Sequence, residues 1–309
     1  MNAPRRLVVI LGPTASGKSD LGIALAEKLR GEVVCCDSTQ VYRHFNIGTG
    51  KVPAAEQRGI PHYLVDLVEP DEIFTAGEYR RRALEVLEAI HSRGKLPILT
   101  AGTGLYLRAL LEGLADAPAR SEGVRERLRQ RALRRSPDCL HRILRRLDRE
   151  SAAHIAPADT QKVIRAIEIR LLSGQRASEL HRRERSGLAG YTAIKIGLMP
   201  PRASLYGRID RRVTAMLESG WLDEVRSLLG QGITPEAKPF EFLGYSQLRD
   251  VLSGKIEMDR AIKQIQQATR QYAKRQITWF RRESAMHWLD GFGDNRSIEE
   301  EAFNIVARA

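Results

Sequence analysis

One short motif near the amino terminus constrains this chain more than any other feature. The segment GPTASGKS, residues 12–19, fits the pattern G-x-x-x-x-G-K-S/T of a phosphate-binding loop. It follows the apolar run RLVVILG and precedes KSDLGIALAEKLR, which has helical spacing with Gly31 as its stop. This order predicts an α/β fold in which backbone N–H groups hold phosphate, Lys18 reaches the outer phosphate and Ser19 offers its hydroxyl to Mg²⁺.

The pattern along the rest of the chain extends that prediction. Apolar runs recur in GEVVCCDS, PHYLVDLV, KLPILTAGTG and YTAIKIGLMPP, and FTAGEYRRRALEVLEAIHSRG reads as an amphipathic helix closed by Gly94. We therefore expect a P-loop NTPase-like parallel sheet flanked by helices, with ligands at the carboxyl ends of the strands. Residues 1–114 would begin this core, residues 115–187 would form a basic helical insertion domain, and residues 188–309 would complete the core and end in basic helices.

The positive charge of the chain is concentrated in two segments. The formal net charge is +12, yet residues 115–185 carry +8 and residues 260–286 carry +6. Such clusters are typical of a protein that binds a polyanion, although an Arg-rich solvated surface explains a charge cluster equally well when it is taken alone.

The C-terminal segment QATRQYAKRQITWFRRE separates into two faces on a helical wheel. One face carries the cations Lys263, Arg270, Lys274 and Arg281. The opposite face carries Ile265, Thr269, Tyr272, Gln276 and Phe280. Only one acid accompanies the seven basic residues between Arg260 and Met286, which favours a helix that follows RNA phosphates over a solvated charged face.

Cysteine usage and hydropathy bear on the compartment. Cys35, Cys36 and Cys139 show neither C-x-x-C spacing nor a paired framework, which favours a reducing compartment and argues against a structural zinc. We find no signal-peptide pattern, and no window approaches the roughly 18 apolar residues of a membrane span. We therefore expect a cytoplasmic protein that does not enter a membrane.

Two strand ends supply candidate catalytic side chains. Asp37 follows the run GEVVCC, where an acid beside a phosphate-binding loop serves as a Mg²⁺ ligand, a helix cap or a general base. Its neighbours Ser38, Thr39 and Gln40 bring groups that can read a base edge. Thr103, in the turn AGTG, is expected at the same edge of the sheet, although a Thr in that position also caps helices.

The segment ADTQKVIRAIEIR predicts a helix within the insertion. Asp159 or Thr160 fits its N-cap. Its apolar stripe consists of Val163, Ile164, Ile167 and Leu171. Gln161, Lys162 and Arg165 would then project elsewhere near the helix N-terminus, where anions are favoured. Taken alone, this pattern is better explained as an ordinary amphipathic helix.

Together these segments resemble the bacterial tRNA dimethylallyltransferase (tRNA isopentenyltransferase) family over nearly the whole chain. The matching segments, in the family's order, are GPTASGKSDLG, DSTQVYRHFNIGTGK, PHYLVD, GTGLYLRALLEGL, HIAPADTQKVIRAIE, RIDRRVTAMLESGWLDEV, LGYSQL and TRQYAKRQITWFRR. The resemblance implies transfer of a dimethylallyl group from dimethylallyl diphosphate to N6 of the adenosine directly 3′ of the anticodon in tRNAs that read codons beginning with U. It also implies a monomer that uses Mg²⁺ and whose loop holds the isoprenoid diphosphate and need not bind ATP.

The resemblance assigns roles to residues of this chain. Asp37 would be the general base, Thr103 its partner near the amine, and Lys18 and Arg212 catalytic cations. The diphosphate loop would comprise Gly12, Pro13, Thr14, Ala15, Ser16, Gly17, Lys18 and Ser19, with Ser19 on the metal. The tRNA contacts would be Asp37, Ser38, Thr39, Gln40, Thr103, Arg125, Gln161, Lys162, Val163, Ile164, Arg165, Leu243, Gly244, Tyr245, Ser246, Gln247, Lys274, Arg275, Gln276, Ile277, Thr278, Trp279, Phe280 and Arg281.

This chain departs from the family's pattern at four places. Thr39 stands where the family has the Arg of DSRQ, and Ala101 opens the turn that is usually GGTG. Lys162 replaces the Arg of DTQR, and no basic residue directly precedes the GY of LGYSQL.

Three other functions stay open. An adenylate dimethylallyltransferase, which makes a cytokinin from a free nucleotide, needs neither the basic insertion nor the cationic helix. A P-loop kinase or NTPase that acts on RNA would share the loop. A non-catalytic RNA-binding module is disfavoured because Lys18, Ser19 and Asp37 are all present.

Overall fold

The computed structural model describes residues 5–136, 138–183 and 186–309 and divides the chain into two compact units. The core unit comprises Met1–Leu111 and Leu188–Ala309, and the insertion unit comprises Glu112–Gly187. The N–H of Leu188 donates to the carbonyl of Leu111 over 3.0 Å, so the chain leaves and re-enters the core unit at neighbouring points. Within the described ranges, no helix has both the length and the apolar character needed to cross a membrane.

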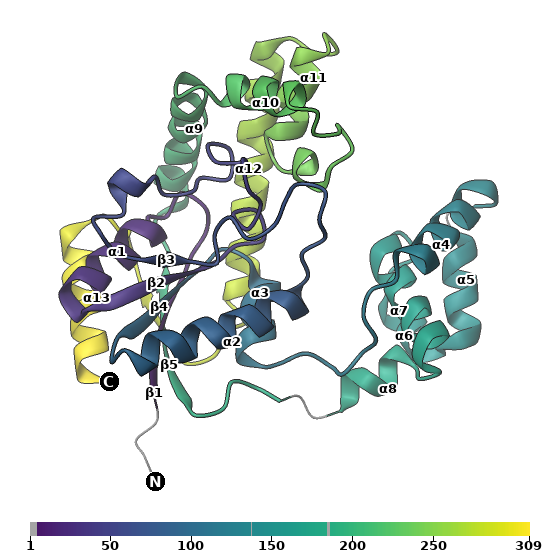
Figure 1. The fold of residues 1–309 in the computed structure, drawn as a ribbon, viewed down its shortest axis with the longest axis horizontal. Helices are drawn as coiled ribbons and strands as arrows, with labels where there is room; N and C mark the ends of the chain where they lie inside the picture. The colour runs from purple at the N-terminus through teal and green to yellow at the C-terminus, as the bar shows by residue number, and fades with distance from the viewer. Residues whose placement is uncertain (1–4, 137, 184–185) are drawn as a thin grey trace. The chain divides into compact units, whose positions relative to one another are not determined.

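A six-stranded parallel sheet forms the centre of the described core unit (Figure 1). Its strands, in spatial order, are β3 (His62–Tyr63), β2 (Gly31–Cys36), β4 (Leu96–Ala101), β1 (Arg5–Leu11), β5 (Tyr191–Leu198) and β6 (Met286–Leu289). β1 lies centrally, with Val8 opposite Ile98 of β4 and Ile194 of β5. Since all the strands are parallel, the carboxyl ends of β1, β2 and β4 meet at one edge, which confirms the predicted α/β class.

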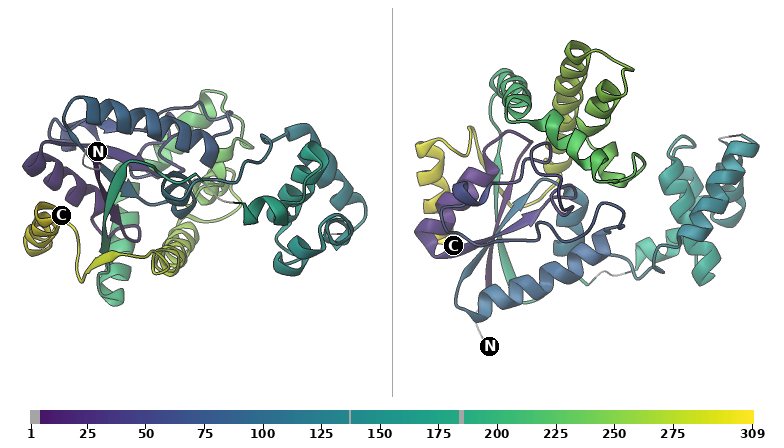
Figure 2. Two further views of the ribbon diagram at one scale, coloured as in Figure 1. Left: turned by 90° about the horizontal axis from the view of Figure 1, so that it is seen from below. Right: turned by 45° about the horizontal axis from the view of Figure 1, so that its top comes forward.

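The alternation of side chains along β1 divides the core between the two faces of the sheet. Leu7, Val9 and Leu11 pack with α2 (Ala76–Ser92) and α3 (Gly104–Leu111). Val8 and Ile10 point the other way and pack with α1 (Lys18–Leu29) and α13 (Arg296–Arg308). Figure 2 shows these helix layers from two further directions. Burial of β1 on both faces explains its continuous apolar sequence.

Further helices follow β5 and build the walls of the site described below. They are α9 (Arg202–Glu218), α10 (Trp221–Gly230), α11 (Tyr245–Leu252) and α12 (Met258–Phe280), with the short 3₁₀ turns η1 (Ala54–Glu56) and η2 (Lys238–Glu241) elsewhere in the loops. Phe45, from the loop after β2, packs against Phe240 and Tyr245 with ring centroids 5.3 and 4.9 Å apart. This apolar cluster anchors the loop after β2 to α10 and α11.

The insertion unit is helical and has an apolar core of its own. Its helices are α4 (Glu122–Arg134), α5 (Asp138–Leu147), α6 (Arg149–His154), α7 (Thr160–Ser173) and α8 (Ala177–Arg182). Asp159 caps α7 by accepting from the N–H of Lys162, as predicted. The buried Asp148 accepts hydrogen bonds from the backbone and hydroxyl groups of Ser151 and Ser178, which ties α6 to α8.

The structure differs from the sequence expectations in four local details. α1 is closed by Arg30 with a φ of 53°, and Gly31 begins β2 instead. The run PHYLVDLV contributes only the two residues of β3, because Leu64 and Asp66 adopt positive φ and leave the sheet. β6 lies in a segment whose pattern does not predict a strand. Leu171 is 57% exposed and does not join the apolar stripe of α7.

Candidate functional site

A cavity of about 920 Å³ lies at the carboxyl edge of the sheet in the core unit. Its walls are the phosphate-binding loop, the ends of β2 and β4, the loop of residues 47–56, and the helices α9 and α12. Lys18, Ser19, Asp37 and Arg212 all line it, and Thr103 directly follows the lining residue Gly102. The fold therefore brings together the residues that we predict from the sequence to be catalytic.

The phosphate-binding loop is shaped to receive an anion. Ala15 and Gly17 have φ values of 62° and 83°, and these left-handed residues curl the backbone immediately before α1 begins. The buried hydroxyl of Ser16 has no hydrogen-bond partner among the described residues. A Cβ on Gly12 would lie 2.7 Å from this oxygen, so glycine permits its position. The left-handed backbone of the loop and the positive end of α1 together favour the binding of an anion here.

Lys18 folds back over this loop. Its Nζ donates to the carbonyl of Pro13 at 2.8 Å, and none of the carboxylates in the described ranges forms an ion pair with it. Burial lowers the pKa of Lys18 to about 8, with the charge of Arg212 acting in the same direction and that of Asp37 opposing it. A buried ammonium without a carboxylate partner favours the arrival of an anionic ligand.

α9 contributes two arginines one turn apart. Arg208 and Arg212 both line the cavity, and the pKa of Arg212 is lowered by burial and by the neighbouring charge of Arg208. Asp294 accepts from Arg208 at 2.6 Å, while the guanidinium of Arg212 lies so close to Gly50 that a Cβ there would collide with it. Like charges gathered at one cavity favour an anion. Sequence reasoning did not select Arg208, although its i, i+4 relation to Arg212 places both on one helix face.

Asp37 is held by one carboxylate oxygen. Oδ1 accepts from the N–H and the hydroxyl of Thr39 at 2.8 and 2.7 Å. None of the described residues donates a hydrogen bond to Oδ2, which lies where a Cβ of Gly102 would be only 2.5 Å away. One oxygen therefore orients the carboxylate, and the other can accept a proton or bind a metal ion. Thr39, which replaces an arginine of the family's pattern, performs the orientation here.

Thr103 joins the turn after β4 to the end of β2. Its Oγ1 accepts from the N–H of Ser38 at 2.9 Å and donates to the hydroxyl of Ser38 at 3.2 Å. The N–H groups of Gly102 and Thr103 both donate to the carbonyl of Cys36 at 3.0 Å. Thr103 thus fixes the backbone directly beside Asp37.

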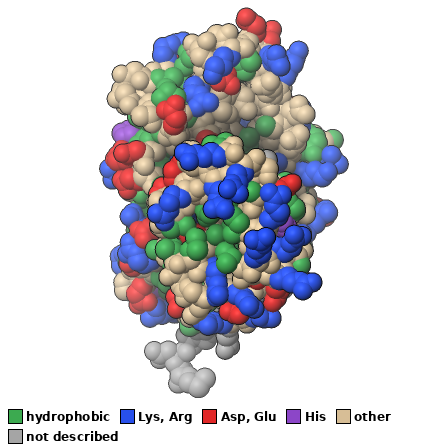
Figure 3. Space-filling model, turned by 90° about the vertical axis from the view of Figure 1, so that its right-hand side faces the viewer, with side chains coloured by type: hydrophobic (Ala, Val, Ile, Leu, Met, Phe, Trp, Pro, Cys, Tyr) green, Lys and Arg blue, Asp and Glu red, His purple; other side chains and the backbone are tan. Residues whose placement is uncertain are grey.

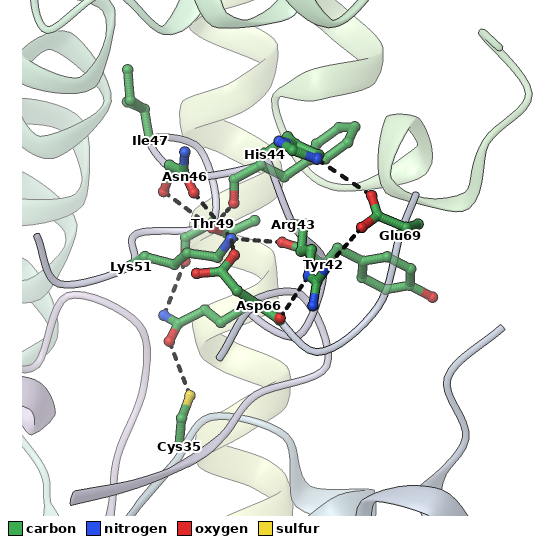
Figure 4. A network of polar contacts seen from close by, with 12 residues as sticks. Cys35, Tyr42, Arg43, His44, Asn46, Ile47, Thr49, Lys51, Asp66 and Glu69 are labelled. Carbon is green, nitrogen blue, oxygen red and sulfur yellow. Dashed lines mark hydrogen bonds and ion pairs between the residues drawn. The ribbon is translucent and has the colours of Figure 1, made fainter. Parts of the chain in front are cut away.

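The loop that follows Asp37 is held by a network of polar contacts (Figure 4). Lys51, whose side chain is 7% exposed, donates to the carbonyl of Tyr42 at 2.6 Å and to the side chains of Asn46 and Asp66. Burial lowers the pKa of Lys51, and the contact with Asp66 opposes that effect. Through these contacts Lys51 connects Tyr42 and Asn46, in the first part of the loop, to Asp66 further along it.

Gln40 makes its contacts inside the same loop. Its Nε2 donates to the carbonyls of Thr49 and Gly50 at 3.2 and 3.1 Å, and its Oε1 accepts from the thiol of Cys35 at 2.9 Å. The side-chain amide of Gln40 therefore supports the loop of residues 47–56 that walls the cavity.

α12 has two different faces. Lys263, Lys274 and Arg281 are exposed, as predicted, whereas Arg270 forms an ion pair with Asp210 of α9. Arg275 lines the cavity with its guanidinium 5.7 Å from the ring centroid of its neighbour Tyr272. Further along the predicted contact segment, Ile277 is half-buried, and Thr278 and Trp279 are exposed.

The predicted contact segment of residues 243–247 is mostly structural. The hydroxyl of Tyr245 donates to Glu224 at 2.6 Å and accepts from the N–H of Gly48 at 3.1 Å, and the side chain is fully buried. A Cβ on Gly244 would collide with the ring of Trp221. Gln247 accepts from the N–H of Gly244 and from the hydroxyl of Ser246, both at 2.9 Å, and Leu243 lines the cavity.

Several residues that the resemblance assigns to tRNA contacts are buried in the structure. Arg125 is 7% exposed, and its Nε and one terminal nitrogen each donate to Glu168 at 3.0 Å. Arg165 donates to the same carboxylate at 2.6 Å. Val163 and Ile164 of α7 are buried as well, and so are Tyr245, Gln276 and Phe280 among the expected contacts in the core unit. These buried side chains pack in the interior of the free protein, whereas the side chain of Arg165 is 33% exposed.

Exposed polar groups remain at the start of α7. Gln161 is exposed, and the side chain of Lys162 is 71% exposed and pairs with Asp159. Figure 3 shows many Lys and Arg side chains on the face that it displays, with fewer acids among them. Gln161 and Lys162 therefore lie at the surface, where a polyanion can reach them.

The expected Mg²⁺ can be judged against the oxygen donors around the loop. The described residues contain no group of three or more His, Cys, Asp or Glu side chains placed to bind a metal. Ser19 lines the cavity together with Asp20 and Asp37. Because Mg²⁺ is commonly held by one or two protein oxygens together with phosphate oxygens and water, this set fits a metal that arrives with a diphosphate.

Comparison with known proteins agrees with the resemblance. The family model described as IPP transferase matches residues 40–283. The tRNA dimethylallyltransferase of Solibacter usitatus is 52% identical over 302 residues, covering 98% of each chain, and that of Koribacter versatilis is 51% identical over 300 residues, covering 97% of each.

Two solved structures share the fold over nearly all of this chain. The full-length tRNA isopentenylpyrophosphate transferase of Bacillus halodurans has a TM-score of 0.73 and 36% identity, covering 98% of this chain and 96% of that one. A eukaryotic dimethylallyltransferase acting on tRNA has a TM-score of 0.83 and 30% identity, covering 99% of this chain and 78% of that one. With a family model over most of its residues and relatives that match along its length, the chain belongs to the IPP transferase family.

Proposed function

We propose that this chain transfers a dimethylallyl group from dimethylallyl diphosphate to N6 of the adenosine 3′-adjacent to the anticodon in tRNAs that read codons beginning with U. One observation carries the proposal: Asp37, whose Oδ2 accepts no hydrogen bond from the described residues, lines the same cavity as Lys18, Arg208 and Arg212. A proton acceptor beside a cationic phosphate site suits group transfer from a diphosphate to an amine. The names of the relatives support tRNA as the acceptor.

The phosphate-binding loop and three cationic side chains bind and stabilise the diphosphate leaving group. The loop amides, Lys18, Arg208 and Arg212 bind the diphosphate and stabilise its charge as the allylic C1–O bond breaks. Mg²⁺, when bound by the Ser19 hydroxyl and the diphosphate, supplies further Lewis-acid stabilisation of the leaving oxygen. The diphosphate in turn stabilises the charged form of Lys18, whose pKa is lowered to about 8 in the free protein.

Asp37 accepts the proton that the amine loses. As the N6–C1 bond forms, the proton of the amine passes to Oδ2, and the diphosphate leaves with the electron pair of the C1–O bond. The hydrogen bonds from Thr39 to Oδ1 keep the carboxylate oriented for this transfer. Thr103, through its contacts with Ser38, holds the adjoining backbone in place.

The target adenosine must leave its stack to reach the cavity. A stacked base in an RNA loop cannot approach a recessed diphosphate, so we propose that the nucleotide is extruded and read by contacts to its edges. Lys274 of α12 and Arg281, which directly follows that helix, bind backbone phosphates together with the basic insertion unit. We propose that the protein acts on tRNA as a monomer in the cytoplasm.

One parallel assay separates this function from its alternatives. The purified protein is incubated with Mg²⁺ and radiolabelled dimethylallyl diphosphate, and it is offered unmodified tRNA or AMP, ADP and ATP. We expect label in tRNA alone, at the adenosine 3′ of the anticodon. Label in the free nucleotides would identify an adenylate dimethylallyltransferase. Rapid Mg²⁺-dependent ATP turnover with no label transferred would support a P-loop kinase or NTPase instead.

A further inference from the structure

Gln276 connects two parts of the cavity that are far apart in the sequence. The side chain is 6% exposed and extends from α12 into the interior. Its Oε1 accepts from the N–H of Thr14 at 2.8 Å, and its Nε2 donates to the carbonyl of Gly102 at 2.8 Å. A backbone N–H can only donate and a carbonyl can only accept, so the two partners require an amide with one group of each kind.

Both partners belong to the site. Thr14 is part of the phosphate-binding loop, and Gly102 directly precedes Thr103. A Cβ built on Gly102 would lie 2.5 Å from Oδ2 of Asp37 and 3.8 Å from Nε2 of Gln276. The amide of Gln276 therefore lies between the loop that would hold the diphosphate and the carboxylate that would accept the proton.

α12 is itself braced at this position. The hydroxyl of Tyr272 donates to the same carbonyl of Gly102 at 3.4 Å, one helical turn before Gln276. Arg270 forms its ion pair with Asp210 of α9, the helix that carries Arg212. The amide is thus presented from an element that is tied to other walls of the cavity.

We propose that Gln276 is a positioning residue that sets the separation between the diphosphate loop and Asp37, and that it acts inside the protein and not as a contact to tRNA. The inference rests on the proposed function, in which C1 of the donor and N6 of the acceptor must come within about 3–3.5 Å in aligned geometry. Thr14 gives its N–H to Gln276, so that amide shapes the loop and the remaining amides bind phosphate.

The first test removes both hydrogen bonds while keeping the side chain's length. For Gln276→Met we expect Mg²⁺-pyrophosphate, measured by calorimetry, to bind about tenfold more weakly because the loop is no longer preorganised. We expect kcat to fall by roughly 10²-fold because the reacting atoms are misaligned, with tRNA affinity unchanged. Gln231→Met is the matched control, since Gln231 is exposed and does not line the cavity.

The second test uses charge. Gln276→Glu keeps the acceptor for Thr14 but loses the donor to Gly102 and places a carboxylate near Asp37. We expect kcat to fall by roughly 10²-fold, as in Gln276→Met, with tRNA affinity unchanged, because the hydrogen bond to Gly102 is lost and the turn beside Asp37 is no longer held in place. Since glutamate has almost the same shape as glutamine, a residue that only filled space would leave kcat unchanged.

The outcomes are distinct. Weaker tRNA binding with normal pyrophosphate affinity and normal kcat at saturating tRNA would make Gln276 an RNA contact and overturn the proposal. Unchanged pyrophosphate affinity and kcat in Gln276→Met would overturn it as well. If Gln276→Met fails to fold, kcat and tRNA affinity of the nearly isosteric Gln276→Glu decide the matter. Absence of transfer by the unsubstituted protein would refute the proposed function, while the pyrophosphate titration would still judge whether Gln276 shapes the loop.

Discussion

The buried carboxylate of Glu168 allows a quantitative test of what the Arg-rich insertion does. Glu168 is fully buried and accepts hydrogen bonds from Arg125, Arg165 and the N–H of Ser121. Burial alone would raise the pKa of Glu168, but these contacts outweigh it and lower the pKa from 4.5 to about 2. A difference of that size corresponds to about 3 kcal/mol of folding free energy at neutral pH.

The sign of the pH dependence follows from the direction of this change. The folded pKa lies below the unfolded one, so the stabilisation is fully present above about pH 4.5 and is lost as the pH falls toward 2. We expect Glu168→Gln to lower the free energy of unfolding of the insertion unit by about 3 kcal/mol at pH 7 and by about 1 kcal/mol at pH 3. An equal loss at both pH values would refute the electrostatic reasoning.

The chain offers a convenient way to locate the effect. All three tryptophans, Trp221, Trp279 and Trp288, lie in the core unit. In urea, tryptophan fluorescence should report an unchanged transition for Glu168→Gln, while far-ultraviolet circular dichroism should report an earlier loss of helix. A shift of the fluorescence transition by the same amount would show that the two units unfold together.

A double substitution then separates folding from RNA binding. Replacing Arg125 with Met and Glu168 with Leu removes the buried pair, and replacements of this kind are often neutral or stabilising. Arg165 loses its carboxylate partner, but its side chain is 33% exposed to water and keeps its hydrogen bond to the carbonyl of Pro118. We expect this variant to fold and to bind tRNA with an unchanged salt dependence. A salt slope reduced by about one would show that Arg125 contacts a phosphate.

The remaining predictions concern the site itself. Asp37→Ala should lower turnover by roughly 10²–10⁴-fold with tRNA affinity retained, because the proton acceptor is gone; unchanged turnover would remove Asp37 from the mechanism. Because the pKa of Lys18 is lowered to about 8, calorimetry should show pyrophosphate affinity declining as the pH rises through 8. Lys18→Arg should lack that component of the decline, and identical profiles for the two proteins would argue against a titrating lysine. Lys274→Ala should weaken tRNA binding and reduce its salt slope by about one, with pyrophosphate binding as the control. An unaltered slope would place that face of α12 in solvent.

The parts of the fold that depend on local pattern could be predicted from the sequence. The apolar run, glycine-rich loop and helix at residues 5–29 specify one another through short-range geometry, and the structure follows them closely. The positions of Asp37 and Thr103 at one sheet edge followed from parallel topology alone.

The errors arise where a distant partner decides the outcome. Arg125 has the same local appearance as a surface arginine, and only the pairing with Glu168 buries it. Arg270 lies on the cationic face of the helical wheel, yet its guanidinium forms an ion pair with Asp210 of another helix. Helical periodicity identifies a face, but it carries no information about which acid the fold brings to that face.

The hydrogen bond between Leu188 and Leu111 has a consequence for how such a chain can change. Because the chain leaves and re-enters the core unit at neighbouring points, the intervening 76 residues form a loop whose two ends lie together. The cost of closing such a loop grows only slowly with its length. Evolution can therefore lengthen, shorten or replace the intervening domain while the strands and catalytic loops keep their register. The chemistry and much of the basic surface reside in parts that can diverge at different rates.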